Sequence, residues 1–129
     1  MHTILVVDDD PAIRHVIRLH LEEAGCEVLC AAGGDEAARL IASRRFDLLL
    51  TDLLMPDRDG LELIRGLRKT HPKLPIVAMT GGGLLSADMY LDIARGLHVD
   101  GVLGKPFGKD ELCTLVRGLL ELAQPRSHP

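Results

Sequence analysis

Five short apolar runs alternate along the chain with stretches in which apolar residues recur at helical spacing. The runs lie at residues 4–7, 28–31, 48–50, 76–79 and 102–103. Apolar runs of this length between turn residues are typical of strands that are buried on both faces. Five strands alternating with five helices predict βαβ units, and therefore a parallel sheet with right-handed crossovers.

Capping signals support several of the helix boundaries. Pro11 suits the first position of a helix with Asp10 as its N-cap, and Gly25 is suited to end that helix. The predicted inner face of this helix consists of Ile13, Val16, Ile17, Leu21 and Ala24. A later helix is predicted to stop at His71 because Pro72 follows it.

The third apolar run leads to one carboxylate, Asp52, and Pro56 turns the chain away four residues later. Asp52 is therefore expected at or just past the carboxyl end of a buried strand, where open α/β sheets bind ligands. One interpretation is that Asp52 is chemically modified there. The other is that Asp52 only starts a turn, as aspartate often does, and this stretch alone leaves both interpretations open.

Polar side chains follow four of the five predicted strands. Asp8 and Asp9 come after the first strand, Asp52 after the third, Thr80 after the fourth and Lys105 after the fifth. Each has a purely structural explanation, since aspartates serve as caps and turn residues and a lysine before a proline suits a loop. Because the carboxyl ends of parallel strands meet at one edge, the combination favours a site.

The residue types at this edge indicate phosphoryl chemistry. Clustered carboxylates repel one another, and a hard cation among them lowers that cost. Oxygen ligands suit Mg²⁺, which would neutralise a phosphoryl group at Asp52. Lys105 would add positive charge and Thr80 a hydrogen bond, which is what phosphoryl transfer chiefly needs. A carboxylate is also an established nucleophile that forms aspartyl phosphate.

Size and composition narrow the function classes. A chain of 129 residues is long enough for one domain with a proper core; we expect that domain at residues 1–123, with a disordered tail at 124–129. The formal charge of −4 offers no basic stripe for nucleic acid, and no apolar run is long enough to span a membrane. No leader sequence is expected, and the three cysteines are expected to be reduced, mostly buried thiols of a cytoplasmic protein.

The chain resembles the receiver domain of two-component response regulators over nearly its whole length. The resemblance rests on Val6-Val7-Asp8-Asp9-Asp10, Asp52 with Met55-Pro56 and Asp59-Gly60, Thr80, and Gly101 through Lys105-Pro106-Phe107. The combination in this order is highly specific, although no single piece is. It implies an α/β, flavodoxin-like, doubly wound five-stranded parallel sheet with strand order 2-1-3-4-5.

The resemblance also implies residue roles. Asp52 is expected to accept a phosphoryl group from a histidine kinase or phosphotransfer protein, in the presence of Mg²⁺ or Mn²⁺. For the metal, Asp9 is expected to be the main ligand, Asp8 to act largely through water, and the Leu54 backbone carbonyl to complete the protein ligands.

Thr80 and Lys105 are implied to contact the phosphoryl group, and the Lys105–Pro106 bond is implied to be cis. Asp10 is expected to serve as a helix cap rather than as a metal ligand.

The chain departs from the family pattern in several places. Val102 stands where an aromatic residue is usual, which leaves the family's mode of readout open. Leu54 and Gly82 are apolar where polar side chains can help water reach the acyl phosphate, so slow autodephosphorylation is predicted. The segment from Thr80 to Lys105 is about three residues longer than usual, and an unusual, mobile fourth loop and helix are expected.

The leading hypothesis is a stand-alone phosphoacceptor switch that is not an enzyme beyond its own phosphorylation. Its output would pass to an unknown protein through the fourth helix, fifth strand and fifth helix, with Met89, Tyr90 and Val102 as candidate contacts. No direct contact with nucleic acid or membrane is expected.

Three alternatives remain open from the sequence. The chain could be the receiver fragment of a larger, transcriptional regulator, or a degenerate receiver used only for docking. It could also be a haloacid-dehalogenase-like phosphatase using Asp8 and Asp10, although Ala12 does not fit that pattern.

Overall fold

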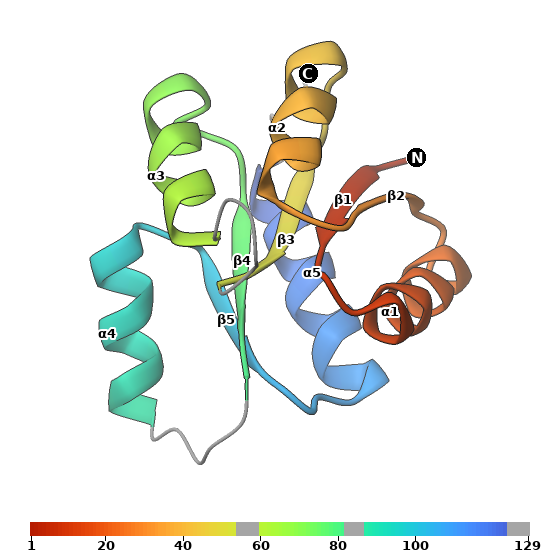
Figure 1. The fold of residues 1–129 in the computed structure, drawn as a ribbon. Helices are drawn as coiled ribbons and strands as arrows, with labels where there is room; N and C mark the ends of the chain where they lie inside the picture. The colour runs from red at the N-terminus through yellow and green to blue at the C-terminus, as the bar shows by residue number, and fades with distance from the viewer. Residues whose placement is uncertain (54–59, 82–86, 124–129) are drawn as a thin grey trace, which may run out of the picture.

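The computed structural model describes residues 1–53, 60–81 and 87–123. Strands and helices alternate strictly along the described chain (Figure 1). They are β1 (Thr3–Val7), α1 (Pro11–Glu23), β2 (Glu27–Ala31), α2 (Gly34–Ser43), β3 (Leu48–Asp52), α3 (Gly60–Thr70), β4 (Ile76–Thr80), α4 (Ala87–Leu97), β5 (Gly101–Gly104) and α5 (Lys109–Ala123). The predicted alternation is confirmed.

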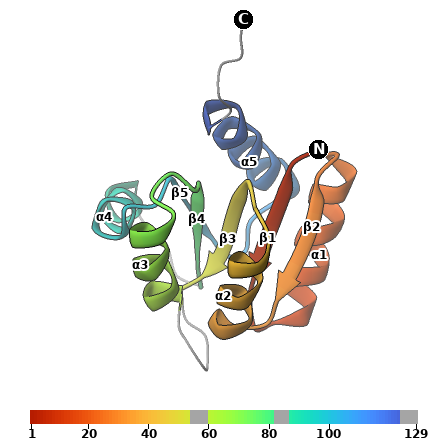
Figure 2. The ribbon, with the colours of Figure 1, turned by 90° about the horizontal axis from the view of Figure 1, so that it is seen from above.

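The five strands form one parallel sheet in the order β2-β1-β3-β4-β5, which confirms the predicted topology. Helices α1 and α5 cover one face of the sheet, and α2, α3 and α4 cover the other (Figure 2). In the register, Val7 lies beside Thr51 and Thr80 beside Gly104, so these strands end close to the same level. The polar residues after the strands therefore share one edge.

The central strands explain why the apolar runs are continuous rather than alternating. In β1, Leu5 and Val7 face the layer of α2 to α4, whereas Ile4 and Val6 face α1 and α5. All five residues of β3 are buried. Because both faces are covered, each buried aliphatic side chain contributes roughly 1.5–3 kcal/mol, and polar alternation would destabilise the strand.

The apolar face predicted for α1 is wider than the face that is buried in the structure. Ile17 and Leu21 are buried, but Val16 is 49% exposed and Ala24 is also exposed. Helix α1 lies on the outer part of the sheet and shares its face with α5, so only a narrow stripe of α1 is covered.

The predicted start of α1 is confirmed. The Asp10 side chain accepts a hydrogen bond from the Ala12 backbone N–H at 2.9 Å. After the helix, Gly25 has φ +93°, in the left-handed region that favours glycine. Asp10 begins the helix and Gly25 follows its end, and both act through contacts with neighbouring residues in the chain. The sequence alone was therefore enough to predict both helix boundaries.

The three cysteines are free and partly buried, in line with the expected mostly buried thiols. No helix among the described residues has the length and apolar character that crossing a bilayer requires. The proposed tail at 124–129 and the loop around Gly82 lie outside the described residues.

Arg68, at the end of α3, links this helix by hydrogen bonds to the turns before β4 and β5, at the edge where the strands begin. Its Nε donates to the His98 carbonyl at 2.6 Å, and its Nη1 donates to the Leu74 carbonyl at 2.7 Å. Its Nη2 donates to Asp100 Oδ2 at 2.9 Å, and that carboxylate oxygen also accepts from the Ile76 backbone N–H. Nothing in the sequence pattern indicated these contacts.

We predict that Arg68→Met lowers the free energy of unfolding by about 2–3 kcal/mol, because several backbone carbonyls and Asp100 lose their donor. The side chain of Arg68 is only 17% exposed, so water replaces the guanidinium poorly. Urea denaturation measures the change. Arg39→Met on the exposed face of α2 is the control, with an expected change within about 0.5 kcal/mol. Equal losses in both variants would contradict the assigned role of Arg68.

Candidate functional site

The carboxyl-terminal edge of the sheet brings the predicted site residues together. Asp8 and Asp9 follow β1, Asp52 ends β3, Thr80 ends β4 and Lys105 follows β5. Carboxylate oxygens of the three aspartates lie within 4.8 Å of one another. Strand register explains this, because β3 lies between β1 and β4 and places its last residue in the middle of the edge.

The acidic residues differ in exposure. Asp8 is fully buried and Asp52 is 9% exposed, whereas Asp9 is exposed. Asp8 Oδ1 accepts a hydrogen bond from the Asp10 backbone N–H at 2.9 Å. Two buried carboxylates on adjacent strands are unfavourable unless a cation or a proton offsets their charge.

Lys105 supplies positive charge to both buried carboxylates. Its Nζ lies 2.6 Å from Asp8 Oδ2 and 3.4 Å from Asp52 Oδ2. The chain turns there at a cis peptide bond between Lys105 and Pro106, as the resemblance implied. These ion pairs join residues that are 97 and 53 positions apart only because β1, β3 and β5 end at the same edge.

The local electrostatics shift two pKa values. Burial raises the pKa of Asp52; the Lys105 ammonium works against this shift, and the nearby Asp8 carboxylate adds to it. Burial alone would lower the pKa of Lys105, but its contacts with Asp8 and Asp52 outweigh that effect and raise the pKa. Lys105 is therefore firmly a cation at neutral pH.

The hydroxyl of Thr80 is buried and has no hydrogen-bond partner within the described part of the chain. Buried hydroxyls in native proteins usually have a partner, and one without a partner needs an explanation. Thr80 ends β4, the strand that pairs with β3, so it lies at the same edge of the sheet as Asp52.

Two residues beside the site had no explanation from the sequence. A Cβ at Gly60 would lie 1.9 Å from the Asp52 carbonyl oxygen, so only glycine fits against the end of β3. The Gly60 N–H donates to the Leu53 carbonyl at 2.8 Å. Arg14 of α1 donates through Nη1 to the Asp8 carbonyl at 2.7 Å. Gly60 belonged to a quoted motif without a physical reason, and no sequence signal marked Arg14.

Some predicted positions lie outside the described residues. They are Leu54, whose carbonyl was the remaining expected metal ligand, and Gly82 in the fourth loop. The side chain of Tyr90 is likewise outside the described set, whereas Met89 is 46% exposed on α4 and Val102 is half-buried on β5.

The donor set fits a magnesium ion. Asp8, Asp9 and Asp52 offer only oxygen atoms, which a hard divalent cation prefers, and the exposed side of Asp9 leaves access for water ligands. A cation there would offset the same repulsion that Lys105 now relieves.

Comparison with known proteins decides the family. A family model described as the response regulator receiver domain matches residues 4–117. The chain belongs to this family. The resemblance seen in the sequence is confirmed, and the phosphatase alternative is not supported.

Curated relatives are considerably longer than this chain. Response regulator MprA of Mycobacterium sp. (strain KMS) is 41% identical over 128 residues, which cover 98% of this chain and 54% of the relative. MprA of Mycobacterium avium (strain 104) is 42% identical over 124 residues, covering 95% and 52%. The chain thus spans about half the length of the curated relatives that it matches.

Solved structures of other receivers have the same fold. The receiver domain of the Francisella response regulator 1452 is 31% identical, with a TM-score of 0.86 and coverage of 96% of this chain and 100% of that chain. TrrA from Thermotoga maritima, in complex with Mg(2+)-BeF, is 34% identical, with a TM-score of 0.79 and coverage of 92% and 99%.

We predict that Asp52→Asn stabilises the protein at neutral pH in the absence of divalent cations. The folded-state pKa of Asp52 is raised, so the folded protein binds this proton more readily than the unfolded chain. Ionisation of Asp52 therefore lowers stability as the pH rises through its folded pKa, and the gain from the variant should disappear as the pH falls below it. Chemical unfolding over a pH series measures the effect.

The control for this experiment is Asp92→Asn, because Asp92 is exposed on α4 and carries no burial penalty. It should give no comparable pH-dependent gain. A stabilisation of Asp52→Asn that stays constant down to acidic pH would show that ionisation of Asp52 is not the cause.

Proposed function

We propose that the chain is a phosphoacceptor signalling switch in which Asp52 receives a phosphoryl group from a histidine kinase or phosphotransfer protein in the cytoplasm. The observation that carries this proposal is the convergence of three carboxylates, the Lys105 ammonium and an unpartnered Thr80 hydroxyl at one edge of the sheet. Membership of the receiver family supports it.

Asp52 is better placed than Asp8 to act as the nucleophile. It ends β3, in the middle of the sheet, and keeps some exposure, whereas Asp8 is fully buried. A carboxylate oxygen of Asp52 would attack the phosphorus as the bond to the donor's imidazole nitrogen breaks, giving an acyl phosphate and the free histidine. This transfer needs positioning and charge stabilisation more than proton transfer.

Lys105 and Thr80 would stabilise the transferred group. The Lys105 ammonium, 3.4 Å from Asp52, would pair with a phosphoryl oxygen as negative charge builds up there. The Thr80 hydroxyl would gain the hydrogen-bond partner that it otherwise lacks.

Asp8, Asp9 and Asp52 would hold Mg²⁺ or Mn²⁺, with the Leu54 carbonyl as a further ligand. The ion would supply positive charge against the phosphoryl oxygens. The Mg(2+)-BeF complex of Thermotoga maritima TrrA supports this choice of metal.

Phosphorylation would change the surface formed by α4, β5 and α5. It adds about −1.5 to −2 charge at neutral pH, and this biases an equilibrium between two arrangements of the site. The output would pass to a partner protein, with Met89 and Val102 as candidate contacts. The greater length of the MprA relatives favours a second candidate, in which the same switch acts on an output segment of its own polypeptide.

The proposal predicts that acetyl phosphate with Mg²⁺ modifies Asp52, as mapped by mass spectrometry of borohydride-trapped peptides. Asp52→Asn should abolish the modification, and Lys105→Met should reduce it by at least about tenfold because a transition-state charge contact is lost. The exposed control Lys109→Met should leave it unchanged. Modification at Asp8 instead, or uptake that survives Asp52→Asn, would overturn the proposal.

The sequence also predicts a long-lived acyl phosphate, because Leu54 and Gly82 offer no polar group to guide water. Leu54→Asn should shorten the phosphoryl lifetime in purified protein with Mg²⁺, whereas Leu54→Met should not. Release of inorganic phosphate over time is the measurement. A lifetime of only seconds in the unmodified protein would show that the prediction is wrong.

A further inference from the structure

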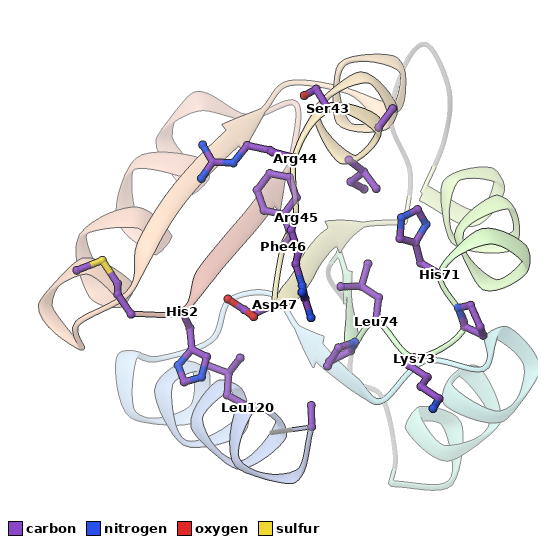
Figure 3. A pocket seen from close by; sticks show the side chains of 16 residues that line it. His2, Ser43, Arg44, Arg45, Phe46, Asp47, His71, Lys73, Leu74 and Leu120 are labelled. Carbon is purple, nitrogen blue, oxygen red and sulfur yellow. The ribbon is translucent and has the colours of Figure 1, made fainter. Parts of the chain in front are cut away.

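A hollow lies at the edge of the sheet opposite the phosphoacceptor site, where the strands begin (Figure 3). It encloses about 1010 Å³ and is formed by segments that are far apart in the chain. These are residues 1–2, 41–47, 71–75 and the end of α5 near Leu120. None of the phosphoacceptor-site residues lines it.

The floor of this hollow is apolar. Phe46, Ile41 and Leu120 are buried beneath it, and Leu74 is half-buried beside them. An apolar floor favours ligands that bring apolar groups as well as charge, because covering it removes hydrocarbon from water.

The residues that line the hollow carry an excess of positive charge. Figure 3 shows Arg44 and Lys73 at opposite sides of the hollow, and Arg45 near its centre. The acidic residue of the lining, Asp47, already accepts a hydrogen bond from the Thr3 backbone N–H at 2.7 Å. Its single negative charge offsets only part of the positive charge of the three cations.

Two of the three cations are free to bind an anion. Arg44 is paired with Glu27 at 3.2 Å and lies 5.6 Å from the centre of the Phe46 ring. Arg45 and Lys73 are exposed, and neither forms an ion pair with any residue in the described ranges. Arginine suits such a site because its planar fork binds carboxylates through two parallel hydrogen bonds.

Helix ends offer a simpler explanation for basic residues here, since helix carboxyl termini attract cations. That explanation fits Arg68, which donates to the Leu74 carbonyl after α3 and to the His98 carbonyl after α4. It does not fit Arg45 or Lys73, for which the described contacts include no hydrogen bond to a helix carbonyl. At the end of α3, the helix-end role is thus taken by Arg68 rather than by Lys73.

The net charge of the chain makes the unpaired cations of the hollow more significant. The chain has a formal charge of −4, so an acidic partner is repelled by most of its surface. A local group of unpaired cations would then orient the approach of such a partner toward this edge.

We propose that this hollow, lined by residues 41–47 and 71–75, docks an acidic peptide segment of a partner protein. Carboxylates of the segment pair with Arg45 and Lys73, and an apolar side chain covers the floor above Phe46. The site lies at the edge of the sheet opposite Asp52, so the partner binds whether or not Asp52 is phosphorylated. A recessed surface suits a peptide better than the flat face of a lipid bilayer.

The test uses a short fluorescein-labelled peptide in which Glu and Leu alternate, with a matched peptide that carries Gln for Glu. Fluorescence anisotropy should show that the Glu peptide binds, that added salt weakens it, and that the Gln peptide binds at least about tenfold more weakly. Arg45→Glu should weaken the Glu peptide by about tenfold or more. Arg39→Glu, an equal charge change at an exposed arginine of α2, should change it by less than about threefold.

Amide chemical shifts should change mainly at residues 41–47 and 71–75 when the Glu peptide is added. Arg45→Gln serves as a second variant if Arg45→Glu fails to fold. Absence of binding, equal losses in Arg45→Glu and Arg39→Glu, or shifts confined to other surfaces would overturn the proposal.

Binding of vesicles containing phosphatidylserine that depends on Arg45, without peptide binding, would also overturn it and assign the hollow to lipid. Asp52→Asn should bind the peptide normally, so failure of this proposal is distinguishable from failure of the phosphoacceptor function.

Discussion

The structure depends on how the negative charge of two buried aspartates is balanced. Asp8 and Asp52 end adjacent strands with almost no exposure to water, and the Lys105 ammonium lies against both. An apolar pair at these positions would serve folding better, since burial penalises both carboxylates. The arrangement makes sense as a site whose charge balance is completed by whatever binds there, and the raised pKa of Asp52 reflects the same cost.

The rest of the fold holds these charges in place. Strands β1 and β3, apolar on both faces, carry the two aspartates to one edge, and Gly60 lets the chain pass closely behind Asp52. At the other edge, Arg68 joins α3 to the turns before β4 and β5. The sheet is thus fixed at both ends, with the three site carboxylates at one edge and the exposed Arg45 and Lys73 at the other.

This separation of charge gives the molecule two surfaces of opposite character. The carboxyl-terminal edge suits a hard cation and a phosphoryl group, and the edge around Arg45 suits carboxylates. Because a partner at the second edge would leave the first uncovered, docking and phosphorylation would be independent events. Receiver-family membership accounts for the first surface, whereas the second is inferred from the lining of the hollow alone.

The sequence by itself determined the alternation of strands and helices, the Asp10 cap and the position of Asp52 after a buried strand. Those features depend on neighbouring residues, whose periodicity and capping chemistry act within one element. Only the tertiary structure decided that Lys105 reaches Asp8, that Val16 is left exposed, that Arg68 joins three segments, and that distant segments enclose a basic hollow. Such contacts depend on strand register and on which part of each helix its neighbours cover, and no local pattern encodes either.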